Sequence, residues 1–78
     1  MKTIKILGTG CAKCKLTETN VRKALAESGI AAEVIKVEDI QDIMAYNILT
    51  TPAVVIDETV IFKGLVPTPA QIIASLNN

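Results

Sequence analysis

The hydrophobic positions in the first half of the chain change their period twice, from strand to helix and back to strand. Residues 3–7 alternate with the two-residue period of a β-strand. After a glycine-containing turn the period becomes that of a helix, which Gly29 is placed to end. Residues 33–37 alternate again, so this half predicts two parallel strands joined by a right-handed helical crossover. The inward stripe of the predicted helix consists of Cys14, Thr17, Val21, Ala24, Leu25 and Ser28.

The second half of the chain begins with a pattern for a short helix and a β-hairpin. Asp39 is placed to cap the helix at its N-terminus. Two β-rich runs, residues 53–56 and 60–62, flank a short polar segment, which is typical of a hairpin. The apolar stripe of the short helix is predicted to consist of Ile40, Ile43, Met44 and Ile48.

A last helix is predicted to begin at Thr68. Thr68 would be the N-cap residue and Pro69 the first helical residue, and Gln71 is placed to reach back to the cap. The element order is therefore β-α-β-α-β-β-α. This order predicts an α/β fold in which a four-stranded mixed sheet carries helices on both faces. The inward positions of the last helix are Ile72, Ile73 and Leu76.

Chain length and composition indicate the number of domains, the cellular compartment and the classes of partner to expect. The 78 residues include 8 basic and 8 acidic side chains and are half hydrophobic, so we expect one small folded domain over residues 1–78. The N-terminal apolar stretch is too short for a secretory signal, and no segment approaches the ~20 apolar residues of a membrane span. We therefore expect a cytoplasmic monomer with no membrane partner. Zero net charge, one Tyr and one Phe argue against a nucleic-acid partner.

The chain has two cysteines and no histidine, which narrows its chemistry. Without histidine there is no Ser–His or Cys–His nucleophilic pair and no His-ligated zinc. Two cysteines allow one disulfide or half of a four-thiolate metal site. In a cytoplasmic protein such a pair is more often catalytic or metal-binding than a structural crosslink.

Cys11 and Cys14 form a CxxC motif that follows a strand and a turn and opens a helix. The thiolate is the attacking form of cysteine, and a helix N-terminus favours an anion, so we expect a lowered pKa for Cys11. Lys13 and Lys15 would lower it further, unless they are simply solvated. Cys14 lies on the inward stripe and is expected to be buried, with a higher pKa. This asymmetry predicts that Cys11 attacks a partner disulfide and that Cys14 resolves the mixed disulfide.

The glycines before the motif, Gly8 and Gly10, have two interpretations. A glycine-rich turn between a strand and a helix can bind a dinucleotide, but the third glycine of that motif is Lys13 here. The chain is also too short for a two-halved nucleotide fold. We therefore expect the glycines to turn the backbone tightly and to leave Cys11 open to a partner. No cofactor is predicted.

Three segments carry a resemblance to a known family: Gly-Cys-Ala-Lys-Cys at 10–14, Thr-Thr-Pro-Ala-Val-Val-Ile-Asp at 50–57, and Gly-Leu-Val-Pro-Thr at 64–68. Together with the element order, they resemble the thioredoxin fold and, within it, the short two-cysteine proteins known as small redox-active disulfide proteins. The resemblance covers nearly the whole chain. It implies a thiol–disulfide oxidoreductase in which the Cys11–Cys14 pair exchanges with the disulfides of partner proteins and is served by a separate reductase.

The resemblance also implies how a substrate would be bound. Pro52 would follow a cis peptide bond and pack beside the disulfide. Thr51 would present its backbone to an extended substrate segment. Gly10 would border the same substrate-binding surface.

The chain also departs from the family pattern. Thioredoxins proper carry Trp before the first cysteine and Gly-Pro between the cysteines, where this chain has Gly10 and residues 12–13 are Ala-Lys. The strand before the motif has no carboxylate to assist proton transfer. Glu18 and Glu38 are the nearest candidates, and we expect both to face solvent. Tyr46 either packs in the core or at a helix end, which we favour, or borders the cysteine surface.

The main alternative function is a soft-metal module that binds copper or zinc through the same two cysteines. Copper-chaperone domains also place a CxxC between a first strand and a first helix. They run β-α-β-β-α-β, however, whereas this chain is predicted to end in a capped helix and has a Thr51–Pro52 turn. A third alternative is a regulatory domain that has kept the fold and lost turnover. We favour the oxidoreductase and expect no bound metal.

Overall fold

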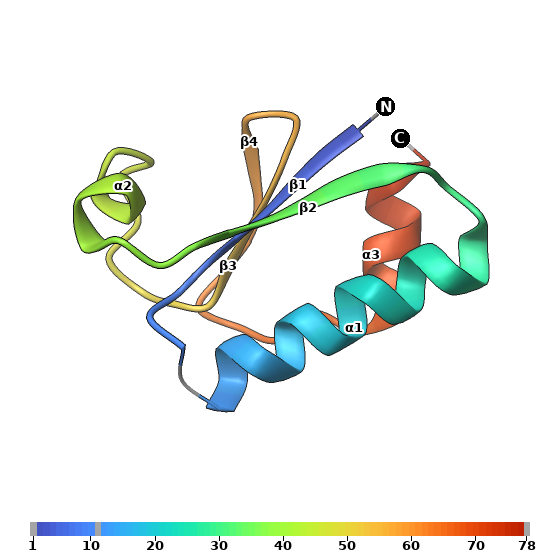
Figure 1. Ribbon diagram of the computed structural model, residues 1–78, viewed down its shortest axis with the longest axis horizontal. Coiled ribbons are helices and arrows are strands. Elements are labelled where there is room, and N and C mark those ends of the chain that lie inside the picture. The colour runs from blue at the N-terminus through green and yellow to red at the C-terminus, as the bar shows by residue number, and fades with distance from the viewer. Residues whose placement is uncertain (1, 11, 78) are drawn as a thin grey trace.

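The computed structural model describes residues 2–10 and 12–77, and its elements follow the predicted order (Figure 1). The α/β fold expected from the sequence is confirmed. The elements are β1 (Lys2–Leu7), α1 (Ala12–Ser28), β2 (Ala32–Val37), α2 (Ile40–Met44), β3 (Ala53–Ile56), β4 (Thr59–Lys63) and α3 (Pro69–Leu76).

The four strands form one mixed sheet in the order β2-β1-β3-β4. β1 runs parallel to β2 and antiparallel to β3, and β3 runs antiparallel to β4. At the end of β1, Leu7 pairs with Val37 on one side and with Ala53 on the other. The loop after β1, the end of β2 and the start of β3 therefore meet at the same end of the sheet.

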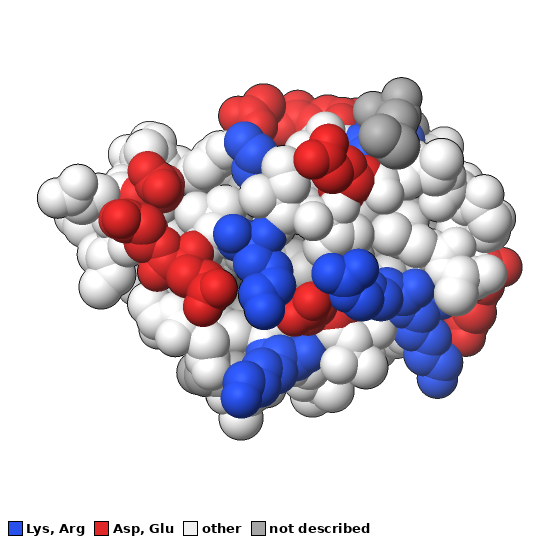
Figure 2. Space-filling model, viewed as in Figure 1, with Lys and Arg blue, Asp and Glu red and all other residues white. Residues whose placement is uncertain are grey.

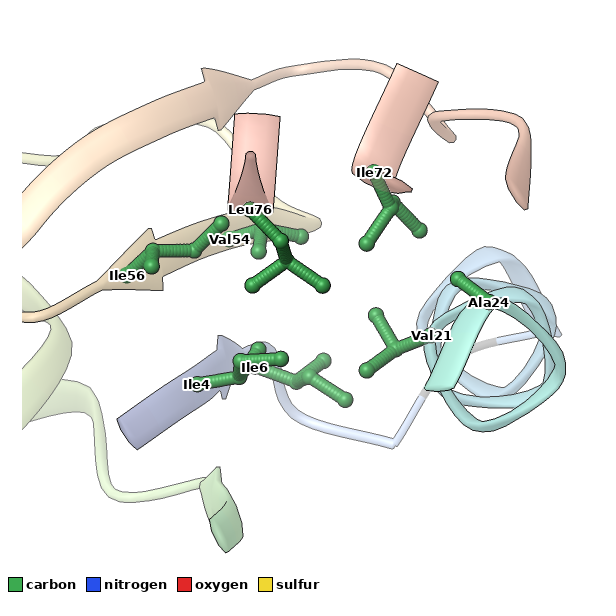
Figure 3. Close-up of a cluster of buried hydrophobic side chains, with 8 residues drawn as sticks. All are labelled: Ile4, Ile6, Val21, Ala24, Val54, Ile56, Ile72 and Leu76. Atoms are coloured by element: carbon green, nitrogen blue, oxygen red, sulfur yellow. The ribbon is translucent and has the colours of Figure 1, made fainter. Parts of the chain in front are cut away.

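One face of the sheet carries the larger hydrophobic core, which α1 and α3 cover (Figures 1 and 3). Alternate residues of the strands point to this face because side chains of a strand alternate between its two sides. Burial of each large aliphatic side chain contributes roughly 1.5–3 kcal/mol to folding. The core residues are Ile4 and Ile6 from β1, Val54 and Ile56 from β3, Val21 and Ala24 from α1, and Ile72 and Leu76 from α3.

The opposite face carries a smaller core beneath α2, so the sheet has helices on both faces as predicted. Leu7 packs there with Ile43 and Ile48. The prediction that Ile40 and Met44 also belong to the buried stripe is wrong, because their exposures are 60% and 56%. α2 has only five residues and meets the sheet with one side, which Ile43 occupies.

Capping residues mark the end of α1 and the starts of α2 and α3 where the sequence predicts. Gly29 has a φ of +70° after α1, and its N–H donates to the carbonyl of Leu25 at 3.0 Å. At the start of α2, the side chain of Asp39 accepts from the N–H of Gln41 at 2.8 Å. Thr68 and Gln71 form the reciprocal capping box of α3. These contacts fix where the connecting loops leave the helices.

The turn between β3 and β4 is tied to β1 and to the segment after α2. The side chain of Lys5 donates to the hydroxyl of Tyr46 at 2.8 Å and to the carboxylate of Glu58 at 2.6 Å. The Lys5 ammonium also lies 5.5 Å from the centre of the Tyr46 ring. Tyr46 packs against the smaller core, which confirms the packing interpretation of this residue. The cluster holds the segment that leads to Thr51 against the sheet.

The stability contributed by the cluster of Lys5, Tyr46 and Glu58 depends on pH through the carboxylate of Glu58. Its pKa lies below the ordinary value of 4.5, chiefly because the Lys5 ammonium donates to it. A lowered folded-state pKa contributes stability above the ordinary value, and that stability is lost as pH falls through the lowered pKa. We therefore expect Glu58→Gln to lower the melting temperature at neutral pH and to have less effect as the solution becomes acidic. Thermal unfolding followed by circular dichroism over a pH series measures this.

Glu33→Gln is the matched control, because Glu33 is an exposed carboxylate on β2. It is expected to change the melting temperature less than Glu58→Gln at neutral pH. A Glu58→Gln effect that stays constant down to strongly acidic pH would contradict the charge-based origin of the stabilisation.

Candidate functional site

The segments that the sequence singled out meet at the end of the sheet where Leu7 pairs with both neighbouring strands. Thr51 and Pro52 immediately precede β3 there, and residues 8–10 lead from β1 toward α1. The peptide bond between Thr51 and Pro52 is cis. Pro52 is buried and Thr51 is exposed. Cys11 lies outside the described residues.

Gly8 lies between the second cysteine and Thr51. A Cβ atom added to Gly8 would overlap the Sγ of Cys14 and would lie 3.9 Å from the Cβ of Thr51. The N–H of Gly8 donates to the carbonyl of Val37 at 3.0 Å, so its backbone is fixed to the end of β2. The sequence predicts Gly8 only as part of a tight turn. The close approach of the sulfur depends on how α1 sits on the sheet, and no local signal shows it.

Gly10 has the left-handed backbone that its residue type predicts, with a φ of +88°. A Cβ added there would lie 3.6 Å from Oε2 of Glu38. The carboxylate of Glu38 therefore lies close to the backbone that directly precedes the CxxC motif. Gly10 is exposed.

Cys14 is buried in the first turns of α1, as its place on the inward stripe predicts, with an exposure of 6%. No acidic residue lies in the first turn of α1. Lys13 and Lys15 are both exposed, and of these two only Lys15 lines the same hollow as Cys14. The structure therefore brings one of the two predicted lysines near the second cysteine.

A hollow of about 90 Å³ lies beside Cys14, and we call it the Cys14 hollow. It has room for a few water molecules and is far too small for a nucleotide. The sequence did not predict that the polar side chains of this lining come together around one hollow. The lining residues are Ile6, Gly8, Gly10, Cys14, Lys15, Glu18, Lys36 and Glu38.

Glu18 is only partly exposed to solvent, with 23% of its side chain accessible, and it also lines the Cys14 hollow. Glu18 contacts Arg22 at 3.1 Å and Lys36 at 3.4 Å. The hydrogen bond from Arg22 is the main cause that holds the pKa of Glu18 below its ordinary value. Cys14 and Glu18 are four residues apart on one helix, a spacing that could have placed them on one face. The contact from Lys36 could not be read from that spacing.

Glu38 is exposed, as predicted, and it also lines the Cys14 hollow. It follows β2, whose end lies beside the end of β1 because the two strands are parallel and in register. The charged side chains around the site have both signs. In Figure 2, basic side chains lie in a row over α1 with an acidic group among them, and acidic side chains gather toward α2.

A second depression, the apolar groove, lies between Thr9 and Thr51 and has a volume of about 270 Å³. Its rim includes the exposed side chains of Ile40 and Met44 on α2. Leu49, which follows α2, is 92% exposed. The residues that define the groove are Thr9, Ile40, Ile43, Met44, Ile48, Leu49 and Thr51.

The end of β4 supports the proline turn. The N–H of Gly64 donates to the carbonyl of Pro52 at 2.9 Å. Gly64 has a φ of +71°, and a Cβ there would lie 3.1 Å from Oγ1 of Thr50. Gly64, the first residue of the 64–68 segment that the sequence linked to the motif only by resemblance, thus contacts the turn at Pro52.

The described part of the chain contains no group of three or more His, Cys, Asp or Glu side chains arranged to hold a metal ion. In the same residues, no helix combines the length and the apolar character needed to cross a membrane.

Comparison with known proteins gives consistent results over nearly the whole chain. A family model described as a thioredoxin domain matches residues 2–77. A protein named thioredoxin from Methanocaldococcus jannaschii is 43% identical over 72 residues, which cover 92% of this chain and 83% of that protein. A protein named thioredoxin from Methanothermobacter thermautotrophicus is 35% identical over 72 residues, covering 92% of this chain and 94% of that protein.

The overlap at Gly8 predicts that this glycine and Cys14 are energetically coupled. Gly8→Ala should destabilise the reduced protein by about 1–3 kcal/mol, because the added methyl group competes with the sulfur for one position. Cys14→Ala removes the sulfur, so in that background Gly8→Ala should cost less. Urea unfolding of the wild type, both single variants and the double variant gives the coupling free energy, expected to be roughly 0.5–3 kcal/mol.

Gly29→Ala is the comparison for a glycine whose backbone alone matters, since no atom lies within 4 Å of its added Cβ. Its cost should be the same with and without the sulfur of Cys14. Strictly additive effects of Gly8→Ala and Cys14→Ala would show that the contact at Gly8 is not the reason for the glycine.

Proposed function

Because the chain belongs to the thioredoxin family and is on that ground a thiol–disulfide oxidoreductase, we propose that Cys11 and Cys14 carry its reaction with protein disulfides. The observation that carries this proposal is the closeness of Gly8 to both Cys14 and Thr51, since a Cβ added there would overlap the Sγ of Cys14 and lie 3.9 Å from the Cβ of Thr51. It brings the resolving cysteine and the Thr-Pro turn, which are far apart in the sequence, to one place.

The proposed reaction has two exchange steps. The thiolate of Cys11 attacks one sulfur of a client disulfide, forms a mixed disulfide and releases the other client sulfur as a thiolate. Cys14 then attacks the Cys11 sulfur, so that the Cys11–Cys14 disulfide forms and the second client thiolate leaves. The client gains two electrons and the cysteine pair loses two. The positive end of the α1 helix dipole and the absence of acidic residues from its first turn support a nucleophilic role for Cys11.

Thr51, Pro52 and Gly10 are proposed to contact the client. Thr51 is exposed next to the site, and an extended client segment can align with backbone groups of such a turn. Lys13 and Lys15 are proposed to favour the thiolate of Cys11 through their positive charge.

The apolar groove supports a protein client rather than a small-molecule disulfide. Thr9 and Thr51 line the groove and also flank the site, so a segment whose disulfide reaches the site passes over the groove. Leu49 and Met44 expose apolar surface there, and covering such surface favours binding. We propose that the groove receives an apolar side chain near the client cysteine.

Nothing in the comparisons or in the described residues supports the metal-binding alternative. In the described residues β3 is followed by β4 and then by α3, an order that differs from the β-α-β-β-α-β order of copper-chaperone domains. The separate reductase, the monomeric state and the cytoplasmic location stay predictions from the sequence.

Substitutions of the two cysteines are expected to block different steps of the exchange reaction. Cys11→Ser should abolish the acceleration that the protein gives to the reduction of insulin disulfides by dithiothreitol, because the attacking sulfur is lost. Cys14→Ser should instead accumulate a client joined through Cys11, because the resolving step is blocked. A turbidity assay and mass spectrometry under non-reducing conditions measure the two results. Wild-type activity no greater than that of Cys11→Ser would contradict the proposed function.

The apolar groove is tested by Leu49→Ser. Loss of about 1 kcal/mol of apolar contact should raise KM for a protein disulfide roughly fivefold. The rate with a small aromatic disulfide should stay unchanged, because that reagent does not reach the groove. Ile61→Ser is the control, since Ile61 is an exposed apolar residue on β4, outside the groove. Equal effects of the two variants on KM would exclude a specific role for the groove.

A further inference from the structure

The second exchange step needs a proton acceptor, because Cys14 must lose its proton before its sulfur attacks. Burial disfavours a charged thiolate, and Cys14 is buried. An acceptor must therefore lie within reach of the sulfur directly or through one water. The Cys14 hollow is the space beside this sulfur, and the two carboxylates that line it are Glu18 and Glu38.

Glu18 is poorly suited to accept the proton. Its carboxylate contacts both Arg22 and Lys36, at 3.1 Å and 3.4 Å. These cations favour the ionised form, which holds the pKa of Glu18 below its ordinary value. A carboxylate held in this way binds a proton weakly at neutral pH. Glu18 instead fixes Lys36 at the rim of the hollow.

Glu38 is not held by cations in this way. None of the salt bridges between described residues involves it. Its Oε2 lies over Gly10, next to the backbone that leads into the CxxC motif. It is exposed on its other side, so it can pass a proton on to solvent.

We propose that Glu38 is the proton-transfer residue of the second exchange step and that it acts on Cys14 through water in the Cys14 hollow. The inference rests on the proposed function of the cysteine pair. The other charged groups that face this space are Lys15 and Glu18 from α1 and Lys36 from β2. The two lysines stabilise the negative charge while it moves from the carboxylate to the sulfur and back.

The step balances in protons and electrons. The Sγ–H bond of Cys14 breaks, and its proton moves through water to the Glu38 carboxylate. The Cys14 thiolate forms a bond to the Cys11 sulfur, and the bond between Cys11 and the client sulfur breaks with its electron pair on the client. The protonated Glu38 then returns the proton to the departing client thiolate or to solvent. The cysteine pair is oxidised by two electrons, and the client is reduced by two.

The two exchange steps can be separated with 5,5′-dithiobis(2-nitrobenzoate). The reduced full chain should release one coloured thiol when Cys11 attacks and a second when Cys14 resolves the mixed disulfide. In stopped flow, Glu38→Gln should leave the first phase unchanged and slow the second roughly 10- to 100-fold near pH 6. The difference should narrow at strongly alkaline pH, where hydroxide can remove the Cys14 proton without the help of a carboxylate. Glu38→Asp, which keeps a carboxylate, should recover part of the second-phase rate.

Glu18→Gln is the matched control, because it removes a carboxylate from the same hollow. It should leave the slope of the second-phase rate against pH as in the wild type. The inference is overturned if Glu38→Gln leaves the second phase unchanged, slows both phases equally, or is reproduced in its pH dependence by Glu18→Gln. A wild type that releases only one coloured thiol and forms no internal disulfide would instead overturn the proposed function, so the two failures are distinguishable.

Discussion

The functional end of this molecule depends on the double pairing of Leu7. Because β1 is the strand between β2 and β3, the last residue of β1 aligns with the last residue of β2 and the first residue of β3. Three connections are thereby forced to one end of the sheet: residues 8–10, Glu38 and the Thr51–Pro52 turn. A shift of register by one residue would move Leu7 from the smaller core to the face of α1 and α3. The hydrophobic pattern that builds the two cores therefore also assembles the site.

The absence of a side chain at Gly8 is the second constraint on the site. With no side chain at Gly8, the sulfur of Cys14 can lie directly against the strand end, with Thr51 on the neighbouring side. Any larger residue would push α1 away from the sheet or turn the sulfur aside. The buried helix face and the exposed proline turn can meet only because this one position has no Cβ. Gly8 thus determines how closely the Cys14 sulfur packs against the sheet, although glycine has no reactive side chain of its own.

Much of the fold follows from local signals in the sequence, whereas the polar part of the site does not. The alternation of Ile4, Ile6 and Leu7, the cap at Thr68 and the stop at Gly29 each act over a few neighbouring residues, and all three are as predicted. The Cys14 hollow requires Glu18 on a helix and Lys36 on a strand to come together. That contact depends on where α1 crosses the sheet, which a periodic pattern does not specify.

The exposed side of α2 shows how a wrong core prediction can point to function. Ile40 and Met44 lie four residues apart, so they share a side of the helix, and the spacing alone suggests burial. The sheet end below α2 is already filled by Ile43 and Ile48, so Ile40 and Met44 stay exposed among the described residues. Exposed apolar surface costs free energy while the protein is free in water. That free energy is regained when a binding partner covers the surface. The same short helix thus closes the smaller core with one side and exposes the other beside Thr51, where we propose that a client binds.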